Sequence, residues 1–155
     1  MDTRIPLGDD EYLKNIGQIV YSVGYLEWLL LGDIASNKNL PASLSSEILS
    51  TKSTGQIARI LQKIPSEDVK DTQLRDWLVM GAEYLSKIAR LRNHILHARP
   101  ATNKSGQQVL YRWTGRPNEQ FYIDQSKLEE LNQLINEALV ALNRNRPSIQ
   151  NKKTA

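Results

Sequence analysis

Several residue types and patterns are absent from this chain of 155 residues. It has no cysteine, which excludes a disulfide framework and a cysteine-based zinc site. No apolar run is long enough to span a bilayer, since the longest, Tyr25–Leu31, contains Glu27. The first residues, MDTRIPLGDDEY, lack the apolar stretch of a signal peptide. We therefore expect a cytoplasmic protein that does not enter a membrane.

Histidine is scarce, and acidic residues are missing from one long stretch. The only histidines, His94 and His97, lie in RLRNHILHARP at 90–100. No Asp or Glu occurs from 84 to 118, whereas this stretch contains seven basic residues: Lys87, Arg90, Arg92, Arg99, Lys104, Arg112 and Arg116. A basic tract without acids suits an anionic partner such as phosphate or RNA. A solvated basic face without a ligand would have the same pattern.

Apolar periodicity predicts a helical fold. With 40% hydrophobic and 24% charged residues, the composition is typical of one soluble domain. Helical spacing predicts helices at about 9–36, 54–63, from between 66 and 72 to about 98, and 124–144. The β-forming segments 109–113 and 120–123 flank a turn-rich spacer and predict a hairpin. We expect an all-α protein: an up-and-down bundle of four or five helices with a small β-hairpin between the last two.

The predicted domain covers residues 1–145, and residues 146–155 are expected to form a flexible basic tail. Thr54 is a candidate cap for the second helix, and Ser126 and Glu129 have the spacing of a capping box at the start of the last.

The first predicted helix is apolar on two sides. One predicted core stripe contains Leu13 and Val20, and a second side carries Tyr21, Tyr25 and Trp28. A helix of this kind is usually buried twice, once in its own core and once against a partner. The third predicted helix has its own core stripe, which includes the following residues: Leu74, Leu78, Gly81, Leu85, Ile88, Ile95 and Leu96.

Two charged residues fall within these apolar stripes. Glu27 lies in that of the first helix and Arg92 in that of the third. Because an unpaired interior charge costs several kcal/mol, we expect Glu27 and Arg92 to pair. Such a pair could be a simple packing salt bridge, or it could hold Arg92 in place for a further task.

Arg92, Asn93 and His97 lie close together near the end of the third helix. Arginine offers a donor fork that matches phosphate, and histidine takes and gives protons near neutral pH. This set suits metal-independent cleavage of RNA, in which the 2′-hydroxyl attacks the adjacent phosphate. Such cleavage ordinarily uses two proton-transferring groups. The second could be His94, or the His97 of a second copy in a symmetric dimer that meets through the first helix.

The segment RNHILH at 92–97 resembles the signature of the HEPN superfamily (higher eukaryotes and prokaryotes nucleotide-binding domains). That signature is an arginine, a short spacer and a histidine, with a polar residue often following the arginine. The resemblance implies a homodimer with a composite site and metal-independent endoribonuclease activity. It also implies a toxin or defence role, with a possible cognate antitoxin. Arg92 and His97 would be catalytic, and Asn93, Glu27 and His94 supporting.

The same resemblance leaves a second function open. Some HEPN members have lost catalysis, so the chain could instead be a module that binds a nucleotide, RNA or a protein. In other members a tyrosine two residues after the histidine is modified by a partner enzyme. Arg99 occupies that position here, which argues against this form of control.

Four basic residues are the predicted RNA-binding set: Arg90, Arg99, Lys104 and Arg112. Tyr111 and Trp113 are aromatic residues of the same basic segment that could contact RNA. His94 and His97 have the spacing of half a metal site, but no further ligand is evident and the nearby arginines disfavour a cation. We therefore expect neither a metal nor a cofactor.

Overall fold

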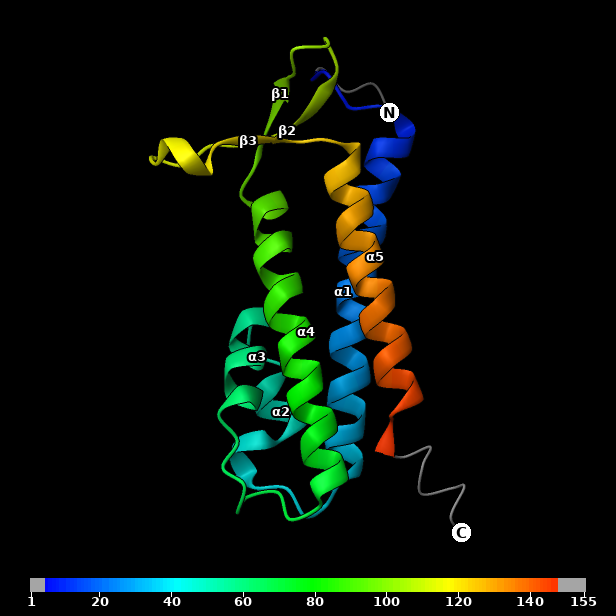
Figure 1. Cartoon of the computed structure of the whole chain (residues 1–155), viewed down its shortest axis with the longest axis vertical. Helices are drawn as coiled ribbons and strands as arrows, with labels where there is room; N and C mark the ends of the chain where they lie inside the picture. The colour runs from blue at the N-terminus through cyan, green and yellow to red at the C-terminus, as the bar shows by residue number, and fades with distance from the viewer. Residues whose placement is uncertain (1–4, 148–155) are drawn as a thin grey trace.

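A computed structural model of the chain describes residues 5–147. Three long helices run in alternating directions (Figure 1): α1 (Asp10–Ser36), α4 (Thr72–Leu96) and α5 (Gln125–Arg144). Of two shorter helices, α3 (Thr54–Gln62) packs against α4, and α2 (Ser46–Leu49) contacts α1. Two 3₁₀ turns, η1 (Ala42–Leu44) and η2 (Pro117–Glu119), complete the helical elements. The predicted helical character is confirmed, and α2 is an additional short helix between the first two predicted ones.

The close approach of α1 and α4 depends on Gly81. A Cβ atom at this position would lie 2.5 Å from Cδ2 of Leu30, whose side chain is fully buried. Glycine therefore lets the α4 backbone approach a leucine that has no room to move. This contact also sets how far the two antiparallel helices are shifted along each other.

The buried face of α1 differs from the predicted one. Leu30 belongs to the predicted stripe and is fully buried, and so are Ile19 and Leu26, which do not belong to it, whereas Val20 is 49% exposed and Leu13 is exposed too. Both stripes keep helical spacing, and periodicity alone cannot choose between two apolar sides of one helix. The placement of Leu13 and Val20 in the core was therefore wrong. Leu96, also predicted to be buried, is 51% exposed at the end of α4.

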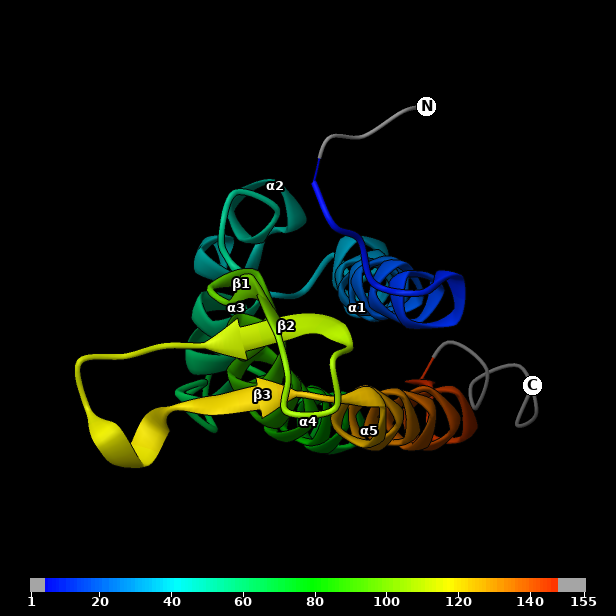
Figure 2. The ribbon, with the colours of Figure 1, turned by 90° about the horizontal axis from the view of Figure 1, so that it is seen from above.

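The β structure is a three-stranded antiparallel sheet in the order β1 (Arg99–Thr102), β2 (Gln108–Arg112) and β3 (Phe121–Ile123). The hairpin of β2 and β3 is confirmed, but β1 was not predicted. β1 has the sequence RPAT, and its proline is tolerated because the strand lies at the edge of the sheet. Seen from above, the sheet lies across one end of the bundle, and the segment with η2 projects beyond it (Figure 2). We call residues 113–120 the arm.

Two of the predicted helix starts were wrong in detail. Ser53, not Thr54, caps α3 and forms a capping box with Gln56. Asp124 caps α5 by accepting a hydrogen bond from the Lys127 N–H, so Ser126 lies inside the helix. In both cases a competing capping residue stands just before the predicted one.

The end of the described chain is fastened to α1. Arg146 Nε donates to Asp33 Oδ1 at 2.7 Å, and the Asp33 side chain is 4% exposed. Arg146 belongs to the segment that we predicted to be a tail, yet it forms this largely buried ion pair. The remainder of the predicted tail, residues 148–155, lies outside the described residues.

Candidate functional site

The junction of α4 and β1 holds the predicted catalytic residues. His97 is the residue that ends α4, and its N–H donates to the Asn93 carbonyl at 3.1 Å. Its own carbonyl accepts from Arg112 Nη1 at 3.0 Å, which ties β2 to the helix end. The Asn93 and His97 side chains are exposed, and neither hydrogen-bonds to any residue of 5–147. Both are therefore free to meet a ligand.

The predicted pair of Glu27 and Arg92 is not formed. The Glu27 carboxylate instead accepts a hydrogen bond from the buried hydroxyl of Thr54, at the start of α3. Arg92 is half-buried, and its Nε has no partner within the described residues.

The cause is the position of each residue along its helix. Because Gly81 lies opposite Leu30 and the two helices are antiparallel, counting along both helices puts Arg92 level with Ile19, eight residues or roughly 12 Å along α1 from Glu27. Helical periodicity gives the face of a residue but not its height in the bundle, so it could not reveal this separation.

His94 is a half-buried residue of α4 that faces β3 and α5. Its ring is edge-on to that of Phe121, with centroids 5.2 Å apart and planes at 76°. Burial lowers the pKa of His94, and the positive charges of Arg112 and Arg90 lower it further, against a weaker opposite effect of Glu119. The imidazole is therefore neutral at pH 7 and can both accept and donate a hydrogen bond.

This lowered pKa predicts a specific sensitivity to acid. Because folded His94 binds its proton less readily than the unfolded chain does, stability should fall as pH drops from about 6.5 through the folded pKa. Denaturant unfolding between pH 7.5 and 5 should show this slope in the wild type and a shallower one in His94→Gln. His97→Asn leaves the half-buried imidazole of His94 in place and should keep the wild-type slope. Equal slopes in all three proteins would contradict the prediction.

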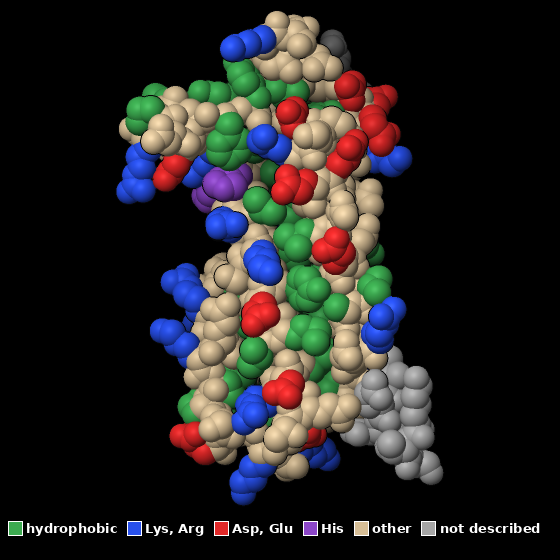
Figure 3. All heavy atoms as spheres, in the orientation of Figure 1, with side chains coloured by type: hydrophobic (Ala, Val, Ile, Leu, Met, Phe, Trp, Pro, Cys, Tyr) green, Lys and Arg blue, Asp and Glu red, His purple; other side chains and the backbone are tan. Residues whose placement is uncertain are grey.

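The predicted RNA-binding residues do not all lie near His97. Arg90 is exposed on the last turns of α4, Arg112 contacts the His97 carbonyl, and Arg99 begins β1. Lys104 lies in the turn at the far end of β1 and does not join this group. Figure 3 shows the histidine side chains beneath the arm with Lys and Arg nearby, while Asp and Glu gather over the start of α5. The basic surface is therefore on the α4 side.

The two aromatic residues of the basic segment differ in exposure. Trp113 is 61% exposed at the base of the arm. Tyr111 is half-buried, with its ring 4.8 Å from that of Tyr122 and its hydroxyl donating to Gln120. Of the two, Trp113 offers the free ring face that stacking on a base would need.

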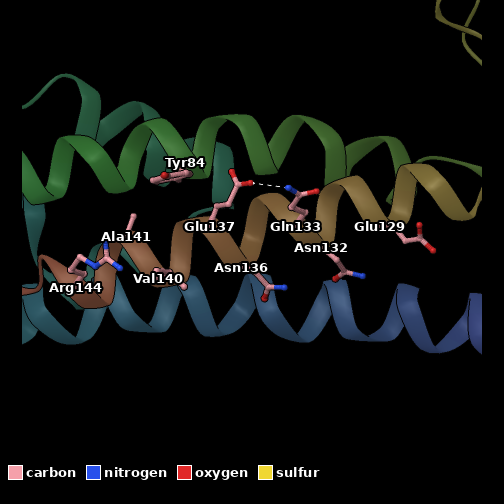
Figure 4. Close-up of a pocket in the computed structure, with 9 residues that line it drawn as sticks. All are labelled: Tyr84, Glu129, Asn132, Gln133, Asn136, Glu137, Val140, Ala141 and Arg144. Carbon is pink, nitrogen blue, oxygen red and sulfur yellow. Dashed lines mark hydrogen bonds between the residues drawn. The ribbon is translucent and has the colours of Figure 1, made fainter.

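A hollow along α5 beside Tyr84 has a volume of about 720 Å³ (Figure 4). None of the predicted site residues lines it. Glu129 and Glu137 do, and Glu137 accepts a hydrogen bond from Gln133. Because carboxylates would repel phosphate, this hollow is a poor place for RNA.

Comparison with models of known protein families, with curated proteins and with solved structures finds no match. Within residues 5–147, no helix is both long and apolar enough to cross a membrane. In the same part of the chain, no three side chains of the metal-binding types come together. A functional assignment therefore depends on the residues and geometry described above.

Proposed function

We propose that this chain is a metal-independent endoribonuclease of HEPN type that acts as a toxin or defence effector. The observation that carries the proposal is the pair of uncommitted side chains, Asn93 and His97, on a basic surface at the end of α4. The backbone of His97 is fixed by Asn93 and Arg112, and its imidazole is open to solvent.

The proposed chemistry needs no metal. The 2′-hydroxyl of RNA attacks the adjacent phosphate, His97 transfers a proton, and an arginine stabilises the developing negative charge. Arg92 is the arginine of the signature; it is half-buried, and its side chain makes no hydrogen bond or ion pair with residues 5–147, so no carboxylate of this part of the chain neutralises its charge. The second proton-transferring group is the His97 of a second copy.

An exposed apolar face of α1 and an exposed leucine at the end of α4 support self-association. From Asn15 to Gly32 the only charged residue is Glu27, which is already engaged by Thr54. This stretch of α1 is about 27 Å long, and its outer face carries Val20, Tyr21 and Trp28. Leu96 adds an exposed apolar side chain directly before His97. A second copy that covers both surfaces would bring its own α4 end to the site.

We expect the wild-type protein to have twice the 17.6 kDa mass of the chain in size-exclusion chromatography with light scattering. Trp28→Glu should shift it to the monomer, because the interface would bury an unpaired charge. Val140→Glu changes an exposed aliphatic residue of α5 and should leave the dimer intact. A monomeric wild type at micromolar concentration would refute the composite site.

The activity is tested by incubating purified protein with labelled RNA in EDTA. Cleavage should occur, should leave a cyclic phosphate, and should stop at a position where a single 2′-deoxynucleotide replaces the ribonucleotide. DNA of the same sequence should remain intact. Cleavage that requires a divalent cation, or that proceeds at the 2′-deoxy position, would exclude this mechanism.

One observation favours a second candidate, a non-catalytic HEPN-like module that binds RNA, a nucleotide or a protein partner. Arg92 is not held by Glu27, so the acidic residue does not orient the arginine as a strict catalytic geometry would require. RNA binding in a gel-shift assay without any cleavage would support this module and contradict the nuclease.

A further inference from the structure

A small pocket next to the proposed site is formed by α4, β3 and α5. It has a volume of about 170 Å³. Half of its lining residues are aliphatic: Leu91 and Ile95 from α4, Ile123 from β3 and Leu131 from α5. The Phe121 ring forms a further wall, perpendicular to the His94 ring. The pocket therefore combines an apolar interior with an aromatic surface.

Three polar side chains at this pocket have no hydrogen-bond partner among residues 5–147, and two of them, Lys127 and Glu130, are exposed. The His94 imidazole, the Lys127 ammonium and the Glu130 carboxylate all line it, and none makes a hydrogen bond or ion pair with the described residues. Lys127 lies 5.7 Å from the centre of the Phe121 ring, a cation–π contact that leaves its donors free. A donor, an acceptor and an imidazole thus surround an apolar space.

The size of the pocket limits what it can hold. Sites for drug-sized ligands have volumes of about 300–1,000 Å³, so this pocket suits a single flat ring system and not a whole nucleotide. Beside the pocket, Arg112 contacts the His97 carbonyl, and the charges of Arg112 and Arg90 both act on His94. An anionic substituent is therefore favoured outside the pocket.

We propose that this pocket binds one nucleobase of the RNA, with guanine preferred, while the attached phosphate lies against Arg112 and Arg90. This inference rests on the proposed function and names the base-recognition site beside it. The apolar walls and Phe121 cover the faces of the base, as unstacked bases are bound in other RNA-recognition sites. Glu130 accepts from the ring N–H and amino group of guanine, and Lys127 donates to its carbonyl oxygen.

The preference for guanine follows from the order of donors and acceptors. Guanine has two adjacent donors beside one acceptor on its pairing edge, which matches a carboxylate next to an ammonium. Adenine offers the ammonium no carbonyl, and cytosine has only one donor group on that edge. Uracil has a single donor between two acceptors, so one of its carbonyls would face the carboxylate.

The experiment is a titration of the full-length His97→Ala protein, labelled with ¹⁵N, with GMP, AMP, CMP, UMP and ribose 5-phosphate, followed by NMR. GMP should shift the amide signals of Leu91, His94 and Phe121 more strongly than the other nucleotides do. Glu130→Gln should weaken GMP binding at least about fivefold, as expected for the loss of a specific base contact. Glu129→Gln, the neighbouring residue on α5 that does not line the pocket, should leave GMP binding unchanged.

Equal shifts with ribose 5-phosphate and GMP would overturn the proposal, because they would indicate a phosphate site without base recognition. An unchanged GMP affinity in Glu130→Gln would overturn it as well. GMP-specific binding by His97→Ala, together with a wild-type protein that does not cut RNA, would keep the base site and reject the nuclease. Cleavage of RNA without any GMP-specific shift would keep the nuclease and reject the base site.

Discussion

His97→Ala should lower the rate of RNA cleavage about 10²–10⁴-fold, the usual contribution of a proton-transferring side chain. The fold should survive, because the hydrogen bonds of His97 to Asn93, Ile95 and Arg112 all use backbone atoms that alanine retains. The exposed imidazole also has no packing role to lose. Initial rates on labelled RNA in EDTA measure the loss, and thermal unfolding monitors the fold.

The same variant also tests whether the proposed site is shared between two chains. If each site uses two His97 residues, mixing wild-type chains with an excess of His97→Ala chains should lower the activity per wild-type chain, since mixed dimers form. A site contained in one chain would keep its activity in the mixture. Full activity of the His97→Ala protein alone would eliminate His97 as a catalytic residue.

The sequence determines the helical elements well because their signals are local. Apolar periodicity located all three long helices to within a few residues, and Pro100 marked the end of α4. The β1 strand was missed because RPAT has a proline and a single strand-forming residue, Thr102, and is held in place by pairing with Gln108–Tyr111. Its turn did carry a local signal: the Asn103 side chain accepts from Ser105 and Gln107, and Gly106 has a φ of 81°.

The site was predictable only where one helix supplies it. Asn93 and His97 were expected on one exposed side of α4, and both are exposed there. The contact of Arg112 with the His97 carbonyl joins residues 15 positions apart, and no spacing rule connects them. Likewise, Glu27 meets Thr54 because α3, which packs against α4, begins close to α1, a fact of tertiary structure that the sequence pattern does not contain.

The pocket beside His94 was missed for the same reason. Three of its residues from β3 and α5 belong to no sequence motif that would mark them: Phe121, Lys127 and Glu130. They gather around His94 because the sheet turns the chain back over the end of α4. The position of the sheet therefore determines the geometry of both the pocket and the helix end that carries His97.

Tyr12→Phe should lower the free energy of unfolding by about 1–3 kcal/mol, because it leaves two backbone groups without a partner. The Tyr12 hydroxyl donates to the Ile123 carbonyl at 2.7 Å and accepts from the Leu110 N–H at 2.9 Å. It thus fastens β2 and β3 to α1. Burial raises the pKa of Tyr12, so its hydroxyl keeps the donated proton at neutral pH.

Chemical denaturation of Tyr12→Phe measures this loss, and Tyr84→Phe is the matched control. Tyr84 lies on α4, outside the proposed dimer face, and its hydroxyl makes no hydrogen bond with residues 5–147, so removing that hydroxyl should change stability by less than about 0.5 kcal/mol. Loosening the sheet should also speed amide hydrogen exchange in β2 and β3, the strands that carry Arg112 and Phe121. Equal stability of the two variants would show that Tyr12 does not hold the sheet above the site.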